Sequence, residues 1–240
     1  HLTKVYDGRV RALQDVNLTV SKGEFLVIVG LSGSGKSTLM RCINRLVEPT
    51  SGQILFDGID VTAAPPEELR HVRRRIGMVF QHFNLVRRST VLTNVLSGRL
   101  GYVNPWASLM HRFPPEEVER AMANLRRVGI SEKAYARADE LSGGQQQRVG
   151  IARALMQEPD MILADEPVAS LDPALRHSVM RHIEALNRDE GMTVICSLHD
   201  IDLVRRYATR IVALKEGRLV WEGLPDQLDA ATFHAIYGED

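Results

Sequence analysis

The chain has 240 residues, and 44% of them are hydrophobic, so it can bury a substantial core as one large domain or two small ones. Its 30 Lys and Arg residues balance 30 Asp and Glu residues, and a net charge of zero argues against a nucleic-acid partner held by a strong positive field. No run approaches the ~18 consecutive apolar residues of a membrane-spanning helix. No signal peptide opens the sequence either, so we expect any membrane role to depend on a partner protein.

The first part of the chain is expected to form a half-exposed, largely antiparallel sheet. Apolar and polar residues alternate in Leu13–Val20 (LQDVNLTV) and again in Gln53–Val61 (QILFDGIDV), as in strands with one solvated face. Because the sequence opens on His1 and not on methionine, we expect further residues, including part of a first strand, to precede it.

A glycine-rich turn, GLSGSGKST, follows the apolar run FLVIVG at Phe25–Gly30. Glycines allow several backbone N–H groups to point at one anion, and the helix expected over Lys36–Leu46 adds the positive end of its dipole. The spacing fits the phosphate-loop pattern, in which Lys36 reaches the β- and γ-phosphates of a nucleoside triphosphate and the Ser37 hydroxyl binds Mg²⁺. The predicted triphosphate site consists of Gly30, Leu31, Ser32, Gly33, Ser34, Gly35, Lys36, Ser37 and Thr38.

Four later runs are continuously apolar and predict parallel strands buried on both faces, with helices between them. They are Ile76–Phe80, Met161–Ala164, Thr193–Cys196 and Arg210–Leu214. The basic run Arg70–Arg75 (RHVRRR) is interpreted as a solvated face without chemistry. Cys42 and Cys196 have apolar neighbours, and we expect buried free thiols in a reducing compartment.

No strand pattern is found between Gln81 and Leu141. Helical spacing in Pro115–Val128 predicts a helix, and Gly101–Pro115, which holds several prolines, is expected to be irregular. We therefore predict a helical insertion in the α/β core, at about residues 82–160.

A second glycine-rich helix start lies in Leu141–Arg153 (LSGGQQQRVGIAR). Ser142 is a natural N-cap, and the two glycines that follow it permit close approach to an anion. Taken alone, the motif is equally compatible with an ordinary helix start.

Polar side chains follow three of the predicted parallel strands, at the ends where ligands bind in open α/β sheets. Asp165 and Glu166 leave their strand in different directions, so Asp165 can support Mg²⁺ while Glu166 positions or deprotonates an attacking water. The amide of Gln81 can reach both the metal and a water, and His199 can contact a γ-phosphate. These parts predict metal-assisted hydrolysis of a phosphoanhydride.

With these motifs in this order, the chain resembles the ATP-binding subunits of ABC transporters over essentially its whole length. The resemblance implies a P-loop NTPase (RecA-like) α/β core with an N-terminal antiparallel β subdomain and an inserted helical signature subdomain, all within one nucleotide-binding domain over residues 1–240. It implies that Tyr6 stacks on adenine and that the D-loop is formed by Ser170, Leu171 and Asp172.

In this family two such domains pair head to tail, so the signature of one subunit closes over the ATP held by the other. The signature residues of this chain are Ser142, Gly143, Gly144 and Gln145. The segment Gln81–Val95 is expected to dock on a permease, with Phe83, Leu85 and Val86 in an exposed loop.

Three further stretches resemble the phosphonate-import ATP-binding subunits: QHFNLVRRSTVLTNVLSGRLGY, KAYARADELSGGQQQRV and the terminal AIYG. Val168–Ala169 and Leu198–Asp200 differ conservatively from that pattern. The likeness implies an Mg²⁺-dependent ATPase, bound peripherally at the cytoplasmic face of the inner membrane, that powers uptake of a phosphonate or a related oxyanion such as phosphite or a phosphate ester. Its implied partners are a second copy, transmembrane permease subunits and, indirectly, a solute-binding protein. The alternatives are an importer for another solute, a soluble ABC protein of translation or DNA maintenance, and an exporter ATPase.

Overall fold

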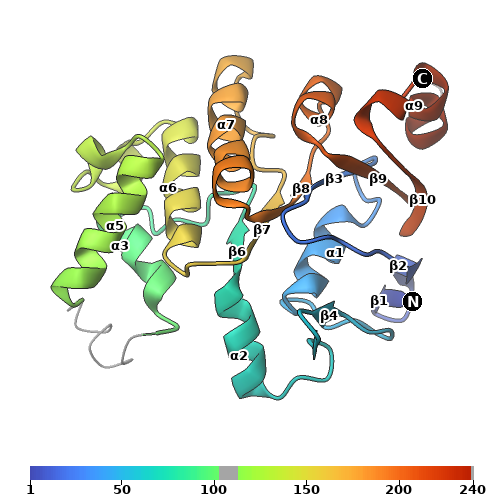
Figure 1. Ribbon diagram of the computed structural model, residues 1–240, viewed down its shortest axis with the longest axis horizontal. Coiled ribbons are helices and arrows are strands. Elements are labelled where there is room, and N and C mark those ends of the chain that lie inside the picture. Colours follow the sequence, from blue (N-terminus) through green and yellow to red (C-terminus); the bar gives the residue numbers. More distant parts are fainter. Residues whose placement is uncertain (103–112, 239–240) are drawn as a thin grey trace.

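A six-stranded sheet in the order β10-β9-β3-β8-β7-β6 forms the centre of the molecule in the computed structural model, which describes residues 1–102 and 113–238 (Figure 1). Five of its strands run parallel, and β10 pairs antiparallel with β9. The continuously apolar runs supply all five parallel strands, which confirms the prediction of an α/β core. The strands are β3 (Phe25–Val29), β6 (Ile76–Val79), β7 (Met161–Asp165), β8 (Thr193–Ser197), β9 (Arg210–Lys215) and β10 (Arg218–Gly223).

Helices cover both faces of this sheet because alternate strand residues point to opposite sides. In β3, Phe25, Val27 and Val29 belong to one apolar cluster, whereas Leu26 and Ile28 belong to the other. The first cluster includes residues of α6 (Gly143–Leu155), α7 (Pro173–Glu190) and α8 (Ile201–Tyr207), and the second includes residues of α1 (Lys36–Ile43) and α2 (Pro66–Arg75).

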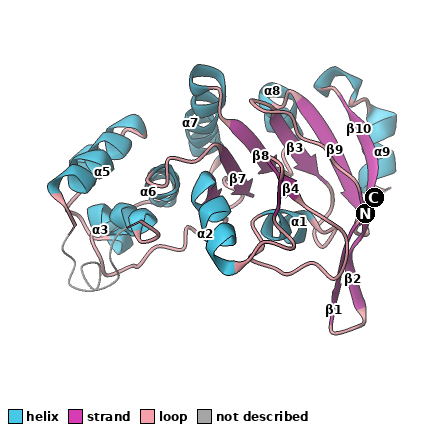
Figure 2. Ribbon diagram, turned by 60° about the horizontal axis from the view of Figure 1, so that its bottom comes forward, coloured by secondary structure: helices cyan, strands magenta, loops and turns pink. Residues whose placement is uncertain are grey.

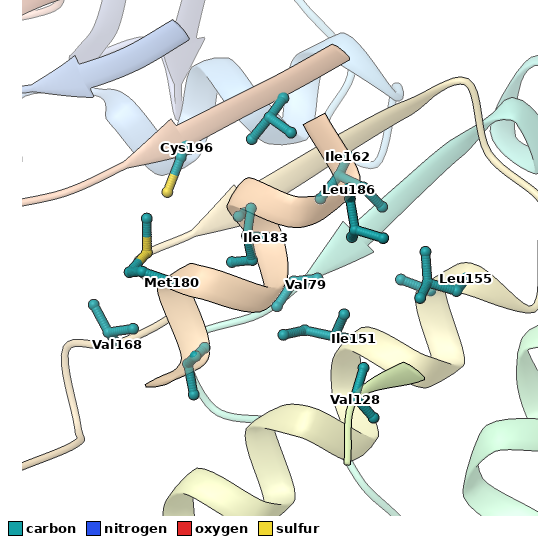
Figure 3. Packing of buried hydrophobic residues seen from close by; sticks show 14 of the residues in the cluster. Val79, Val128, Ile151, Leu155, Ile162, Val168, Met180, Ile183, Leu186 and Cys196 are labelled. Atoms are coloured by element: carbon teal, nitrogen blue, oxygen red, sulfur yellow. The ribbon is translucent and has the colours of Figure 1, made fainter. Parts of the chain in front are cut away.

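Helix α7 is anchored in the core by buried side chains between Val179 and Leu186. Figure 3 shows Met180, Ile183 and Leu186 of α7 facing Ile162 of β7 and Cys196 of β8, and all five side chains are buried. Burying side chains of this size contributes about 1.5–3 kcal/mol each. The start of α7, which lies near the carboxyl ends of the strands, is therefore fixed relative to the sheet.

The N-terminal part is antiparallel, as expected, but it forms two separate short pairs and not one sheet. They are β1 (Leu2–Tyr6) with β2 (Val10–Val16), which project from the rest of the molecule in Figure 2, and β4 (Leu55–Phe56) with β5 (Ile59–Asp60). The predicted bounds are wrong. Leu13–Val20 is strand only as far as Val16, the partner of Leu2, because alternation continues beyond the residues that have a pairing partner. Gln53–Val61 is a tight hairpin, with positive φ at Asp57 and Gly58.

Between β6 and α6 the described residues form helices, including the one predicted over Pro115–Val128. The elements are α3 (Val91–Leu96), η1 (Ser97–Arg99), α5 (Pro115–Arg127), η2 (Ser131–Lys133) and η3 (Ala138–Glu140). Most of the stretch expected to be irregular, Gly101–Pro115, lies outside the described residues. Helix α6 contacts both α5 and β6, so the helices of this region and the sheet share one core.

The basic run forms the end of α2, where Arg70, His71 and Arg73 are exposed, as expected of a solvated face, while Arg74 and Arg75 are partly buried. Arg73 Nε donates to the Asn44 carbonyl oxygen over 3.0 Å, and Arg75 pairs with Asp57 and Asp160 at 2.7 and 2.5 Å. The Arg74 guanidinium lies 4.4 Å from the centre of the Tyr102 ring. These side chains hold α2 against neighbouring segments.

Both cysteines are buried free thiols, as predicted. Burial raises the pKa of the Cys42 thiol to about 11 and also raises the pKa of Cys196.

The chain continues through η4 (Pro225–Gln227) to α9 (Ala230–Tyr237). In residues 1–102 and 113–238, no helix is long and apolar enough to cross a membrane.

Candidate active site

The turn between β3 and α1 needs glycine where it passes closest to neighbouring backbone. At Gly30, with φ of +142°, a Cβ would lie 2.1 Å from the Leu214 carbonyl oxygen. At Gly35, with φ of +106°, a Cβ would lie 2.4 Å from the Ala12 carbonyl oxygen. The turn is thus fitted between β9 and β2, and its conformation is one that residues with a side chain rarely adopt.

Lys36 begins α1 and is almost completely buried. Its Nζ donates to the carbonyl oxygens of Gly30 and Leu31, over 2.8 and 3.0 Å, and lies 3.8 Å from Glu166 Oε1. Burial lowers the pKa of Lys36, and the carboxylates of Glu166 and Asp165 partly offset that effect. The hydrogen bonds of this buried ammonium go to two neutral carbonyl oxygens, which phosphate oxygens could replace.

Asp165, at the end of β7, is buried and held by two hydroxyl groups. Ser37 Oγ donates to Asp165 Oδ1 over 2.8 Å, and Ser197 Oγ donates to the same oxygen over 3.2 Å. Ser197 also accepts from the backbone N–H of Glu166 over 2.9 Å. The Arg41 guanidinium lies 3.7 Å from Asp165 Oδ2. Ser197 thus fixes both acidic residues, a role that its position at the end of β8 suggests but that the sequence analysis missed.

Glu166 forms a hydrogen bond with His199 Nε2. Glu166 has a φ of +46°, a left-handed conformation that is uncommon for a residue with a side chain and that is often found at functional sites. A cavity of about 340 Å³ opens beside this pair. Its lining residues are Glu166, Val168, Ala169, Arg176, Ser197, Leu198, His199 and Asp200.

The structure therefore brings five predicted site residues into direct contact, namely Lys36, Ser37, Asp165, Glu166 and His199. Gln81 follows β6, which is paired with β7, and so lies at the same edge of the sheet. Among the described residues, its side chain makes no hydrogen bond to that group. Tyr6 ends β1 and is 36% exposed, with the Lys4 ammonium 4.8 Å from its ring centre.

The second glycine-rich motif starts α6 as predicted. Ser142 and Gln145 form a capping box, since Ser142 Oγ accepts from the Gln145 N–H and Gln145 Oε1 accepts from the Ser142 N–H. A Cβ at Gly143 would lie 3.2 Å from Leu171 Cδ2, and one at Gly144 would lie 3.0 Å from Leu175 Cδ1. Within the described part of the chain, no hydrogen bond or ion pair joins the motif to the phosphate loop.

The three predicted D-loop residues differ in exposure. Ser170 and Asp172 are exposed, and Asp172 caps α7 by accepting from the Leu175 N–H over 3.1 Å. Leu171 is buried against the start of α6.

The segment Gln81–Val95 is only partly the exposed apolar loop that was expected. Val86 is 63% exposed, but Phe83 and Leu85 pack against the core.

A phosphate loop between a parallel strand and a helix, with an acidic pair at the end of a nearby strand, defines a P-loop nucleoside-triphosphate-binding protein. The sequence matches the ABC transporter family over residues 13–169, and the chain belongs to that family.

Two relatives have similar names. The phosphonates import ATP-binding protein PhnC of Bdellovibrio bacteriovorus is 55% identical over 240 residues, which are 100% of this chain and 92% of that protein. The protein of the same name from Bacillus thuringiensis subsp. konkukian is 54% identical over 239 residues, 100% of this chain and 93% of its own.

Solved structures of ATP-binding cassettes have the same fold. The dimeric post-hydrolysis state of the cassette MJ0796, bound to ADP and Pi, has a TM-score of 0.82 and 38% identity and covers 93% of this chain and 96% of its own. A nucleotide-free cassette from an ABC transporter has a TM-score of 0.85 and 32% identity, and the match covers 99% of this chain and 98% of that cassette.

Proposed function

We propose that this chain is the ATP-hydrolysing subunit of an ABC importer that takes up a phosphonate or a related oxyanion. The observation that carries the ATPase assignment is the contact group at the carboxyl edge of the sheet, where Lys36 and His199 both approach Glu166 and where Ser37 meets Asp165. The phosphonate assignment is supported by relatives of that name that are 50–55% identical over 99–100% of this chain.

In the proposed reaction, Lys36 exchanges its two carbonyl partners for β- and γ-phosphate oxygens, and the loop N–H groups bind the same phosphates. Glu166 accepts a proton from the attacking water, and His199 orients the Glu166 carboxylate and the γ-phosphate. General-base assistance of this kind contributes about 10²–10⁴ in rate. Tyr6 stacks on the adenine ring.

The residues also fit Mg²⁺, which prefers oxygen ligands and is usually bound through one or two carboxylates together with substrate phosphates. Ser37 Oγ and Asp165 Oδ1 are two such oxygens, 2.8 Å apart, and the Gln81 amide oxygen is a third from the same edge of the sheet. Mg²⁺ bound with ATP would neutralise phosphate charge. No group of three or more His, Cys, Asp or Glu in the described residues could hold a metal alone, so the fit depends on the phosphates.

The direct test is steady-state phosphate release from Mg-ATP by the purified protein, with Lys36→Ala as the informative variant. We expect this variant to lose turnover and to bind nucleotide weakly, because the only cation buried in the loop is gone. Lys22→Ala, which changes an exposed lysine before β3, is the matched control and should retain the wild-type rate. Wild-type turnover by Lys36→Ala would overturn the assignment of the site.

Two copies are proposed to pair head to tail, so that Ser142, Gly143, Gly144 and Gln145 of one copy close on the ATP of the other. Within the described residues, this capped, glycine-rich helix start makes no hydrogen bond or ion pair with the phosphate loop of its own chain, which supports this arrangement. Ser170, Leu171 and Asp172 would lie at the same interface. The dimeric cassette among the similar structures has the same fold.

A permease is proposed to bind the segment Gln81–Val95, which would hold the subunit at the cytoplasmic face of the membrane. Val86, with the exposed Arg87 and Arg88, is the candidate docking point. Val86→Asp should reduce co-purification with the permease and leave the thermal midpoint unchanged. Leu85 is unsuitable for this test because it packs against the core. Unchanged co-purification of Val86→Asp would contradict the docking proposal.

The solute is tested in cells, because the transported molecule is not expected to touch this subunit. Deletion of the gene should abolish growth on a phosphonate as sole phosphorus source, and the wild-type gene but not Glu166→Gln should restore it. Growth of the deletion strain at the wild-type rate would exclude phosphonate as the required solute while leaving the ATPase assignment intact.

A further inference from the structure

Leu171 connects the start of α6 to the start of α7. Its buried side chain lies against Gly143, where a Cβ would be 3.2 Å from Leu171 Cδ2, so this contact has no room to spare. Its carbonyl oxygen accepts a hydrogen bond from Arg176 Nε over 2.9 Å. A shift of the α6 start therefore reaches Arg176 through a single buried residue.

The other end of the Arg176 guanidinium reaches the segment that carries His199. Arg176 Nη1 donates to Asp200 Oδ2 over 3.2 Å. Asp200 Oδ1 accepts from the N–H groups of Asp202 and Leu203, so this carboxylate also caps α8. Because Asp200 follows His199 directly, the ion pair fixes the backbone next to the histidine that contacts Glu166.

Arg176 is well placed to couple the two segments because its helix is anchored in the core. It lies in the first turns of α7, whose Met180 and Ile183 are fully buried against the sheet (Figure 3). The cavity beside Glu166 is lined by Arg176, His199 and Asp200 together, so the ion pair forms part of the wall of the site.

We propose that Arg176 is a positioning residue that links Leu171 to His199 through Asp200. This link couples the position of the α6 start to the position of the His199–Glu166 pair. The α6 start serves the partner's ATP, and the His199–Glu166 pair acts on the chain's own ATP. The inference rests on the proposed ATPase function and on its head-to-tail dimer.

A purely structural role and a positioning role of the Arg176–Asp200 ion pair can be told apart by comparing stability with catalytic rate. The side chains of Arg176 and Asp200 are 32% and 36% exposed, and ion pairs of that exposure contribute little to stability. If Arg176 acts by positioning, its loss should therefore change the catalytic rate much more than the stability. The ATP concentration for half-maximal rate should change little, since neither residue belongs to the phosphate loop.

The experiment compares Asp200→Asn, Arg176→Gln and the double variant by steady-state ATP hydrolysis and thermal unfolding. Asparagine is as good an N-cap as aspartate, so Asp200→Asn removes the charge and keeps the cap of α8. We expect kcat to fall about tenfold in each single variant, with KM for ATP within about twofold of wild type. The double variant should be no slower than the single ones, because all three break the same link.

Two control variants test whether any loss of an N-cap charge or of an exposed arginine slows ATP hydrolysis. Asp229→Asn makes the same change at the N-cap of α9, and Arg188→Gln removes an exposed arginine paired with Asp189 near the end of α7. Both controls should retain the wild-type kcat.

The proposal is overturned if Asp200→Asn hydrolyses ATP at the wild-type kcat, or if the rates of the two single variants fall by independent, multiplying factors. Asp200→Asn decides the matter even if Arg176→Gln fails to fold. Absence of hydrolysis by the wild-type protein would overturn the ATPase assignment itself, so the two failures are distinguishable.

Discussion

The hydroxyl oxygen of Ser37 lies 2.8 Å from Oδ1 of Asp165, a residue 128 positions further along the chain. This contact joins the first turn of α1 to the end of β7. It exists because both elements meet at the carboxyl edge of a parallel sheet, where strand ends and helix starts converge. The phosphate loop, the acidic pair and His199 are thereby collected at one edge from three separate strands.

Glu166→Gln is expected to bind Mg-ATP but to hydrolyse it about 10²–10⁴ times more slowly than wild type, because it loses the proposed general base. Glutamine keeps the size of the side chain, and Lys36 and the loop remain to hold the phosphates. Steady-state phosphate release and nucleotide titration measure the two effects separately. Saturating ATP should also trap a dimer detectable by size-exclusion chromatography. A variant that binds ATP tightly and stays monomeric would contradict the head-to-tail pairing.

Gly30→Ala and Gly33→Ala should differ strongly in stability although both change the phosphate loop. A Cβ at Gly30 would meet the Leu214 carbonyl oxygen at 2.1 Å, whereas nothing lies within 4 Å of a Cβ at Gly33. The Gly33 variant should lose only about 1–2 kcal/mol, the cost of a left-handed conformation. The Gly30 variant should lose clearly more, because backbone must move as well. Urea unfolding measures both, and equal losses would show that the close approach at Gly30 is unimportant.

The positions of the main site residues could be predicted from the sequence because they depend on local patterns. Continuous apolar runs identify parallel strands, and a residue that directly follows such a run, as Gln81 and His199 nearly do, lies at the ligand-binding edge. Helix α2 also has a local sequence signal, since Pro66 at its start and two acidic residues in its first turn are typical of a helix N-terminus.

Contacts between distant segments could not be predicted in the same way. The pairing of Arg176 with Asp200, and of Leu171 with Gly143, depends on where α6, α7 and β8 lie in space, and no local pattern in the sequence encodes it. The end of β2 at Val16 has the same origin, because a strand extends only as far as its partner does.

The buried thiols should make stability fall as the pH rises from about 9 to about 11. Burial raises the pKa of Cys42 from 9.0 to about 11, so the folded protein keeps this proton while the unfolded chain releases it, which favours unfolding in that window. The slope is at most about 1.4 kcal/mol per pH unit for one thiol. Cys42→Ala should therefore lose stability less steeply than wild type above pH 9, by urea unfolding. If the stabilities of wild type and Cys42→Ala fall in parallel above pH 9, the prediction is contradicted. A constant difference in stability between the two proteins at pH 6–8 is the internal control.

Ser142→Arg tests whether the start of α6 acts on the ATP of a second subunit. Ser142 is exposed and caps α6, so the substitution should cost about 1 kcal/mol of stability through the lost cap. Nucleotide binding by the monomer should change little, because Lys36 and the phosphate loop of the same chain are intact. ATP-driven dimerisation should fail, since a bulky side chain would occupy the space where the backbone must approach a γ-phosphate.

Mixing Ser142→Arg with Lys36→Ala subunits makes this test decisive. A head-to-tail heterodimer has two composite sites, and in one of them an intact phosphate loop from the Ser142→Arg chain faces an intact signature from the Lys36→Ala chain. We expect ATP to drive association of the mixture, measured by size-exclusion chromatography, while each variant alone stays monomeric. Ser142→Ala, which removes the cap without adding bulk, separates the cost of the lost cap from the blocked approach and should still dimerise. If the mixture does not associate where Glu166→Gln does, the two glycine-rich helix starts do not complement each other across a dimer.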